Sequence, residues 1–193
     1  VCFHQLAAPL PRGAFLEIAP GVAVCSPELV FVQLAETLPM GELIALGYEF
    51  CGCYPLEANR SGALVRAQLT TPARLSAFVN RVERMKGQRK ARIAVQFVYA
   101  KSASAKETEM DALLMTPMRW GGLSLPPALA NEPVALSEEA ARIARGDRVV
   151  CDLLWPQARV AAEYDGLAFH GGRHQQARDS RRRDALIADG FDV

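Results

Sequence analysis

The sequence predicts an α/β protein in two parts, and three observations support this. Short apolar segments alternate with helix starts that are marked by a capping side chain and, twice, by a proline. The stretch 150–166 is typical of two strands joined by a turn. A small polar segment at 101–106 is a plausible boundary, so we expect a smaller α+β domain over 1–102 and a second domain over 103–193.

The composition is that of an ordinary globular protein. The 193 residues are 50% hydrophobic and 22% charged, which fits one large or two small domains. We expect no signal peptide and no membrane partner, because no apolar run is long enough to span a bilayer. The cysteine count of 5 is odd, and most cysteines sit in apolar runs, which favours a reducing cytoplasm. The oligomeric state stays open.

The first part predicts a strand pair followed by helices. A turn at Pro20-Gly21 separates two short apolar strands. Ser26-Pro27 and Thr71-Pro72 each place a capping side chain before a proline, which is typical of a helix start. The expected elements are strands at 14–18 and 22–25, helices at 27–37, 40–46 and 73–85, and an apolar segment at 93–99 that fits either helix or strand.

The second part predicts helices around a strand hairpin. Ser104 and Glu107 have the spacing of a capping box, so a helix begins there. Gly190 suits the position after a helix end. The expected elements are a strand at 131–136, a helix at 137–144, the hairpin with its turn at 155–158, a helix at 174–189, and the opening of a further strand at 191–193 that continues beyond this sequence.

Each strand of the hairpin carries an acid where an apolar residue is expected, Asp152 in the first and Glu163 in the second. Acids are rarely buried without a partner. If the loop has an even length, paired residue numbers have an odd sum, and the two acids then share a face. Strands lie about 4.8 Å apart, so one Mg²⁺ at roughly 2.0–2.1 Å from each oxygen could bridge them. An odd loop without a bulge would separate them.

Further acids could complete a magnesium site whose bound water attacks a phosphodiester. The helical carboxylate Glu107 is a third candidate ligand, and Asp165 could be another ligand or could orient one. Each acid also has a structural alternative. Glu107 could be a capping-box partner, Asp152 a hydrogen-bonded acid at a strand end, Glu163 the salt-bridge partner of an arginine, and Asp165 a turn residue before glycine.

Basic residues follow the hairpin. Arg178, Arg181 and Arg182 recur at spacings that put them on one side of the last helix. Such a run usually marks a solvated face, but beside an acidic metal site it favours contact with DNA phosphates. His170 and His174 could each transfer a proton or contact phosphate, or could be loop histidines that face solvent.

The segments DLLWPQARVAAEYDG, FH and RDSRRRDALIADGF resemble a bacterial domain family of unknown function that is related to the very-short-patch-repair (Vsr) endonucleases. That family belongs to the PD-(D/E)XK nuclease superfamily, and the resemblance covers roughly residues 103–193. It implies a restriction-endonuclease-like mixed sheet flanked by helices and a magnesium-dependent DNA hydrolase. The implied site residues are Glu107, Asp152, Glu163, Asp165 and His170, with Asp165 standing where the wider superfamily, but not the Vsr-like branch, has a lysine.

A second, shorter resemblance lies in residues 24–35, which are similar to a Thr-Ser-Pro pattern in AbiEi-type antitoxins of toxin–antitoxin systems. It implies that the first domain regulates or recognises DNA. Three functions therefore stand beside one another. The first is a DNA endonuclease, and the second is a catalytically inactive DNA-binding regulator or antitoxin-like protein. The third is an interaction domain, in which the hairpin acids face apart or each pair with an arginine.

Overall fold

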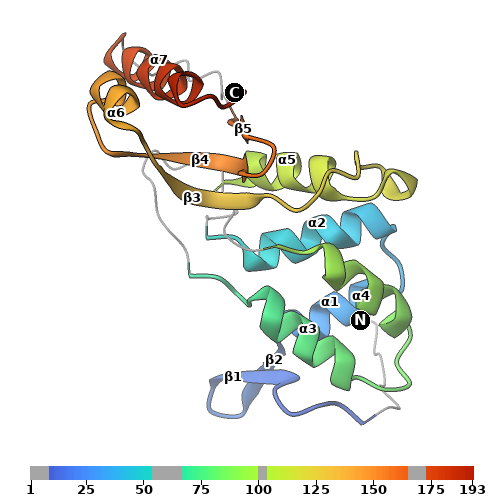
Figure 1. Ribbon diagram of the computed structural model, residues 1–193. Helices are drawn as coiled ribbons and strands as arrows, with labels where there is room; N and C mark the ends of the chain where they lie inside the picture. The colour runs from blue at the N-terminus through green and yellow to red at the C-terminus, as the bar shows by residue number, and fades with distance from the viewer. Residues whose placement is uncertain (1–8, 54–66, 100–103, 165–172) are drawn as a thin grey trace. The chain divides into compact units, whose positions relative to one another are not determined.

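The computed structural model of the chain describes residues 9–53, 67–99, 104–164 and 173–193. Over these residues the fold is mixed α/β, with helices and two small antiparallel sheets (Figure 1). The chain divides into two compact units, Val1–Leu125 and Pro126–Val193. The functional division expected near residue 102 stays a prediction. No helix within the described ranges combines the length and apolar character needed to cross a bilayer.

The first unit begins with a hairpin and continues as packed helices. Strand β1 (Phe15–Ala19) pairs antiparallel with β2 (Val22–Cys25), as predicted. The strand pair is followed by α1 (Pro27–Leu34), α2 (Met40–Cys51), α3 (Pro72–Arg81), α4 (Gln88–Ala94), the 3₁₀ turn η1 (Val95–Phe97), α5 (Ala105–Met115) and the 3₁₀ turn η2 (Met118–Trp120). The core of this unit includes the fully buried side chains of Leu29, Phe31, Leu43, Ile44 and Leu75.

Side-chain caps begin three of these helices where the sequence predicted them. The hydroxyls of Ser26 and Thr71 each accept a hydrogen bond, at 3.2 Å, from the backbone N–H three residues later. The Ser104 hydroxyl accepts from the Glu107 N–H at 3.1 Å. Each bond satisfies an amide that the first turn of a helix leaves without a partner. The predicted starts of α1, α3 and α5 are therefore confirmed.

Three predicted helix ends were wrong. Helix α1 ends at Leu34 and not at residue 37, because residues 35–37 form turns. Helix α2 continues past Gly47 to residue 51, because this glycine makes room for a neighbour: a Cβ there would collide with the side chain of Val98. Helix α3 ends at Arg81, because Val82 is extended and Arg84 takes a left-handed backbone conformation with φ 55°. The ambiguous segment 93–99 is helical as far as residue 97.

The second unit packs two helices against a three-stranded antiparallel sheet. The strands lie in the order β3 (Leu129–Ala135), β4 (Arg148–Trp155) and β5 (Val160–Ala162). Helices α6 (Glu138–Ala144) and α7 (Arg173–Ala188) lie side by side over this sheet (Figure 1). The predicted strand and helices are confirmed to within the one or two residues by which element ends ordinarily vary.

The fully buried side chain of Leu186 packs helix α7 against the sheet. It packs in a cluster with Val149, Cys151 and Leu154 of β4. The next residue along the helix, Ile187, is 53% exposed. Burial of Leu186 therefore fixes which side of α7 faces the strands.

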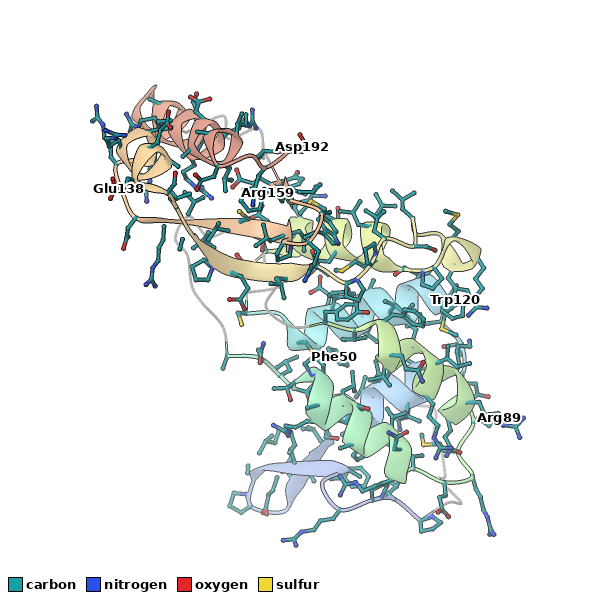
Figure 2. The ribbon with its side chains drawn as sticks, viewed as in Figure 1. Phe50, Arg89, Trp120, Glu138, Arg159 and Asp192 are labelled. Atoms are coloured by element: carbon teal, nitrogen blue, oxygen red, sulfur yellow. The ribbon has the colours of Figure 1, made fainter. Side chains whose placement is uncertain are left out.

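The chain end is fastened to the hairpin turn. The Arg159 Nε donates to the Gly190 carbonyl at 3.1 Å, and its guanidinium also bonds the preceding carbonyl. Asp192 forms a parallel bridge to Val160, and its carbonyl accepts from an amide of β5 at 2.8 Å (Figure 2). The strand expected to open at 191–193 is thus present as one parallel bridge at the edge of an antiparallel sheet.

Replacing Leu186 by alanine tests how α7 is docked. We expect the free energy of unfolding to fall by about 2–5 kcal/mol, because the change leaves a cavity against the sheet. The neighbouring change Ile187→Ala should cost less than about 1 kcal/mol, because that side chain is half in solvent. Urea unfolding followed by circular dichroism measures both, and equal losses would contradict docking through Leu186.

Candidate functional site

The β4–β5 hairpin places Asp152 and Glu163 opposite each other. The turn occupies residues 156–159, an even number, and the pair nearest the acids is Leu153 with Ala162. Continuing this register by one residue pairs the two acids, so the register predicted for an even loop is confirmed. The turn begins one residue later than predicted, because the preceding tryptophan still pairs with β5.

Asp152 is hydrogen-bonded, as its structural alternative anticipated, but it lies inside β4 and not at a strand end. Its Oδ2 accepts from the backbone N–H of Tyr164 at 2.7 Å. Tyr164 directly follows Glu163, so this bond ties β4 to the segment that carries the second acid. The spacing of the two carboxylates is thereby held by the backbone as well as by the strand register.

Glu163 is paired with an arginine of α7. The Arg182 Nη2 lies 3.0 Å from Glu163 Oε1, and the glutamate side chain is only 15% exposed. The same nitrogen donates to the Val150 carbonyl at 2.5 Å. Pro133, which lies opposite Val150 in the β3–β4 register, has no amide hydrogen to offer that carbonyl. Arg182 therefore binds both the acid and the strand.

Burial between the strands disfavours the charged form of Glu163. Burial raises the pKa of Glu163 above its ordinary value, Arg182 opposes this rise, and the charge of Asp152 adds to it. The pKa of the Cys151 thiol is raised to about 11, first by burial and then by Glu163. The positive charge of Arg182 therefore offsets part of the cost of burying the Glu163 carboxylate.

A cleft of about 620 Å³ lies beside the acids, within the second unit. One wall is a face of β4, on which Arg148, Val150 and Asp152 alternate with buried residues. Helix α7 and the turn between α6 and β4 complete it. The arginines among its described lining residues are Arg145, Arg148, Arg178, Arg181 and Arg182, and the acid among them is Asp152.

The three predicted phosphate-binding arginines of α7 all line this cleft, so the common face inferred from their spacing is confirmed. The sequence interpretation missed Arg148 and Arg145. The strand period of two could have found Arg148, because it stands four residues before Asp152 on the same face. No local pattern predicts Arg145, because its place depends on the path of the turn after α6.

The described structure does not place the other predicted site residues relative to the acid pair. Glu107 lies in the first unit, in the first turn of α5, where its amide is capped by Ser104. Asp165 and His170 lie outside the described residues, and His174 lies in α7 with a side chain that is not described.

The two hairpin carboxylates fit Mg²⁺ by the chemistry of their donor atoms. Across the described residues, no three side chains of His, Cys, Asp or Glu gather as a metal-binding group. Magnesium, however, commonly takes one or two carboxylates from a protein and fills its other positions with water and phosphate oxygens. Asp152 and Glu163 can supply that share, with one Glu163 oxygen already bonded to Arg182.

Comparison with known proteins adds no relative. No family model matches the chain, and no curated protein or solved structure is significantly similar to it. The resemblance to Vsr-related nucleases therefore rests on the hairpin and helix residues quoted in the sequence, and the site itself must support any functional proposal.

Acidification tests the environment of Glu163. An acid whose pKa is raised in the folded state holds more protons when folded than when unfolded, so its contribution to the free energy of unfolding falls as pH rises through that window. The variant Glu163→Gln has no such proton. When the pH is lowered from about 7 to about 4, we expect the free energy of unfolding of the wild type to rise relative to that of Glu163→Gln.

Urea unfolding at both pH values measures this difference. Glu139→Gln, at an exposed position of α6, is the matched control and should show no such gain. A wild-type advantage that stays constant over the range would contradict the raised pKa that burial gives Glu163.

Proposed function

We propose that this chain is a magnesium-dependent DNA endonuclease of the Vsr-like branch of the PD-(D/E)XK nucleases. The observation that supports it best is an acid pair beside an arginine-lined cleft in one compact unit. Carboxylate oxygens suit a hard divalent cation, and arginines suit phosphate. A site that offers both suits hydrolysis of a phosphodiester.

In this proposal Asp152 and Glu163 hold the metal, with Asp165 as a further carboxylate. Bound Mg²⁺ would stabilise the charge that develops on the phosphate and activate a water. The Tyr164 amide orients Asp152, and Arg182 orients Glu163. The proposed proton-transfer residue is His170. The proposed phosphate-binding residues are Arg178, Arg181, Arg182 and His174.

A second candidate is a DNA-binding regulator whose nuclease site has lost its chemistry. The ion pair between Arg182 and Glu163 favours it, because the arginine already compensates the acid without a metal. The presence of Asp165 where the wider superfamily has a lysine also favours an inactive site. This candidate predicts salt-dependent DNA binding with no metal-dependent cleavage.

The third candidate, an interaction domain without a nucleic-acid role, predicted acids that face apart or that each pair with arginine. Glu163 does pair with an arginine, as this candidate expects, but the strand register does not turn Asp152 and Glu163 to opposite faces. This candidate does not explain why several arginines line the cleft that Asp152 also lines.

A plasmid-nicking assay distinguishes the first two candidates. We expect Mg²⁺-dependent nicking by the wild type and a loss of at least about 100-fold in Asp152→Asn and in Glu163→Gln, because each change removes charge from the proposed metal site. Glu139→Gln is the matched control and should nick normally. Nicking that persists in both site variants would reject the assignment, and DNA binding without nicking by the wild type would favour the regulator.

A further inference from the structure

We infer that the turn joining α6 to β4 binds the DNA phosphate backbone through Arg145 and Arg148, in the cleft that Asp152 also lines. The inference rests on the proposed function for the identity of its ligand as DNA. It does not require cleavage, so an inactive DNA-binding protein would use the same subsite.

The placement of the arginines is the first argument. Arg145 and Arg148 line the cleft from the turn and from the start of β4, while Arg178 and Arg181 line it from α7. Guanidinium groups that share a cleft repel one another unless an anion lies between them. A cleft of about 620 Å³ is far larger than one phosphate, and its cations come from separate elements, which favours an extended polyanion over a small ion.

An unsatisfied donor inside the cleft is the second argument. The Nε of Arg181 is buried, and it finds no hydrogen-bond acceptor among the described residues. Buried donors without a partner are rare in native proteins. Arginine in protein–DNA interfaces donates to phosphate oxygens, which are acceptors of the kind that this nitrogen lacks.

The backbone of Arg145 is the third argument. It caps α6 with φ 58° and ψ 39°, a left-handed conformation that glycine or asparagine adopts far more readily. Local folding therefore disfavours arginine at this position. Residues that break a local rule are often placed for function, and Arg145 is one of the residues that line the cleft.

The test is DNA binding by the full chain with the metal chelated. A short fluorescently labelled duplex is titrated by anisotropy in EDTA over a series of NaCl concentrations. We expect Arg145→Asn and Arg148→Gln each to weaken binding and to reduce the slope of log affinity against log salt by about 1. Arg142→Gln, an exposed arginine of α6 outside the described lining, should leave the slope unchanged.

Folding is controlled within the same set of variants. Asparagine suits the left-handed backbone, so Arg145→Asn should melt at or above the wild-type temperature while it binds DNA less well. Arg145→Lys keeps the charge and should retain the wild-type salt slope. A loss of binding in Arg145→Asn together with retention in Arg145→Lys would assign the effect to the cation.

Two outcomes would overturn the inference. One is a wild-type chain that does not bind the duplex, and the other is a salt slope in Arg145→Asn and Arg148→Gln equal to that of Arg142→Gln. The endonuclease proposal fails separately: salt-dependent binding through these arginines with no nicking in Mg²⁺ would reject the nuclease and leave the subsite standing.

Discussion

The contact of Arg182 with Glu163 and with the Val150 carbonyl is the interaction on which the second unit depends. Helix α7 is largely polar and buries little besides Ala185 and Leu186. Arg182 stands one turn before Leu186 and therefore shares its face of the helix. The leucine supplies apolar docking, and the arginine sets the helix against the strand by bonding two acceptors at once. A planar guanidinium with several donors suits that task better than an ammonium group.

The same contact explains why acids and cations gather at one end of this unit. By seating α7 on β4, it brings the other arginines of the helix to the cleft that Asp152 also lines. It also leaves Glu163 largely buried near a second carboxylate, with a raised pKa that Arg182 only partly offsets. The candidate functions differ in one physical respect, namely whether a divalent cation joins Arg182 in compensating these two acids.

Rules that involve only residues close in sequence predicted the hairpin register and the helix starts. They did not predict contacts between residues that are distant in the chain. The hairpin register followed from loop parity, and the helix starts followed from Ser and Thr caps, because both depend on neighbours in sequence. Gly47 was misjudged as a helix end because its role is set by Val98, which is distant in the chain. The sequence likewise left several arginines as possible partners of Glu163. Burial of Leu186 sets the face of α7 that meets the strand, and Arg182 lies on that face.

Direct binding of Mn²⁺, a spectroscopic substitute for Mg²⁺, tests the central claim that the two hairpin acids form a cation site. Electron paramagnetic resonance of the full chain titrated with Mn²⁺ reports bound and free ion without any need for DNA. The account predicts binding by the wild type and by Glu139→Gln, and its loss in Asp152→Asn and Glu163→Gln. Equal Mn²⁺ binding by all four proteins, or no binding by the wild type, would contradict it.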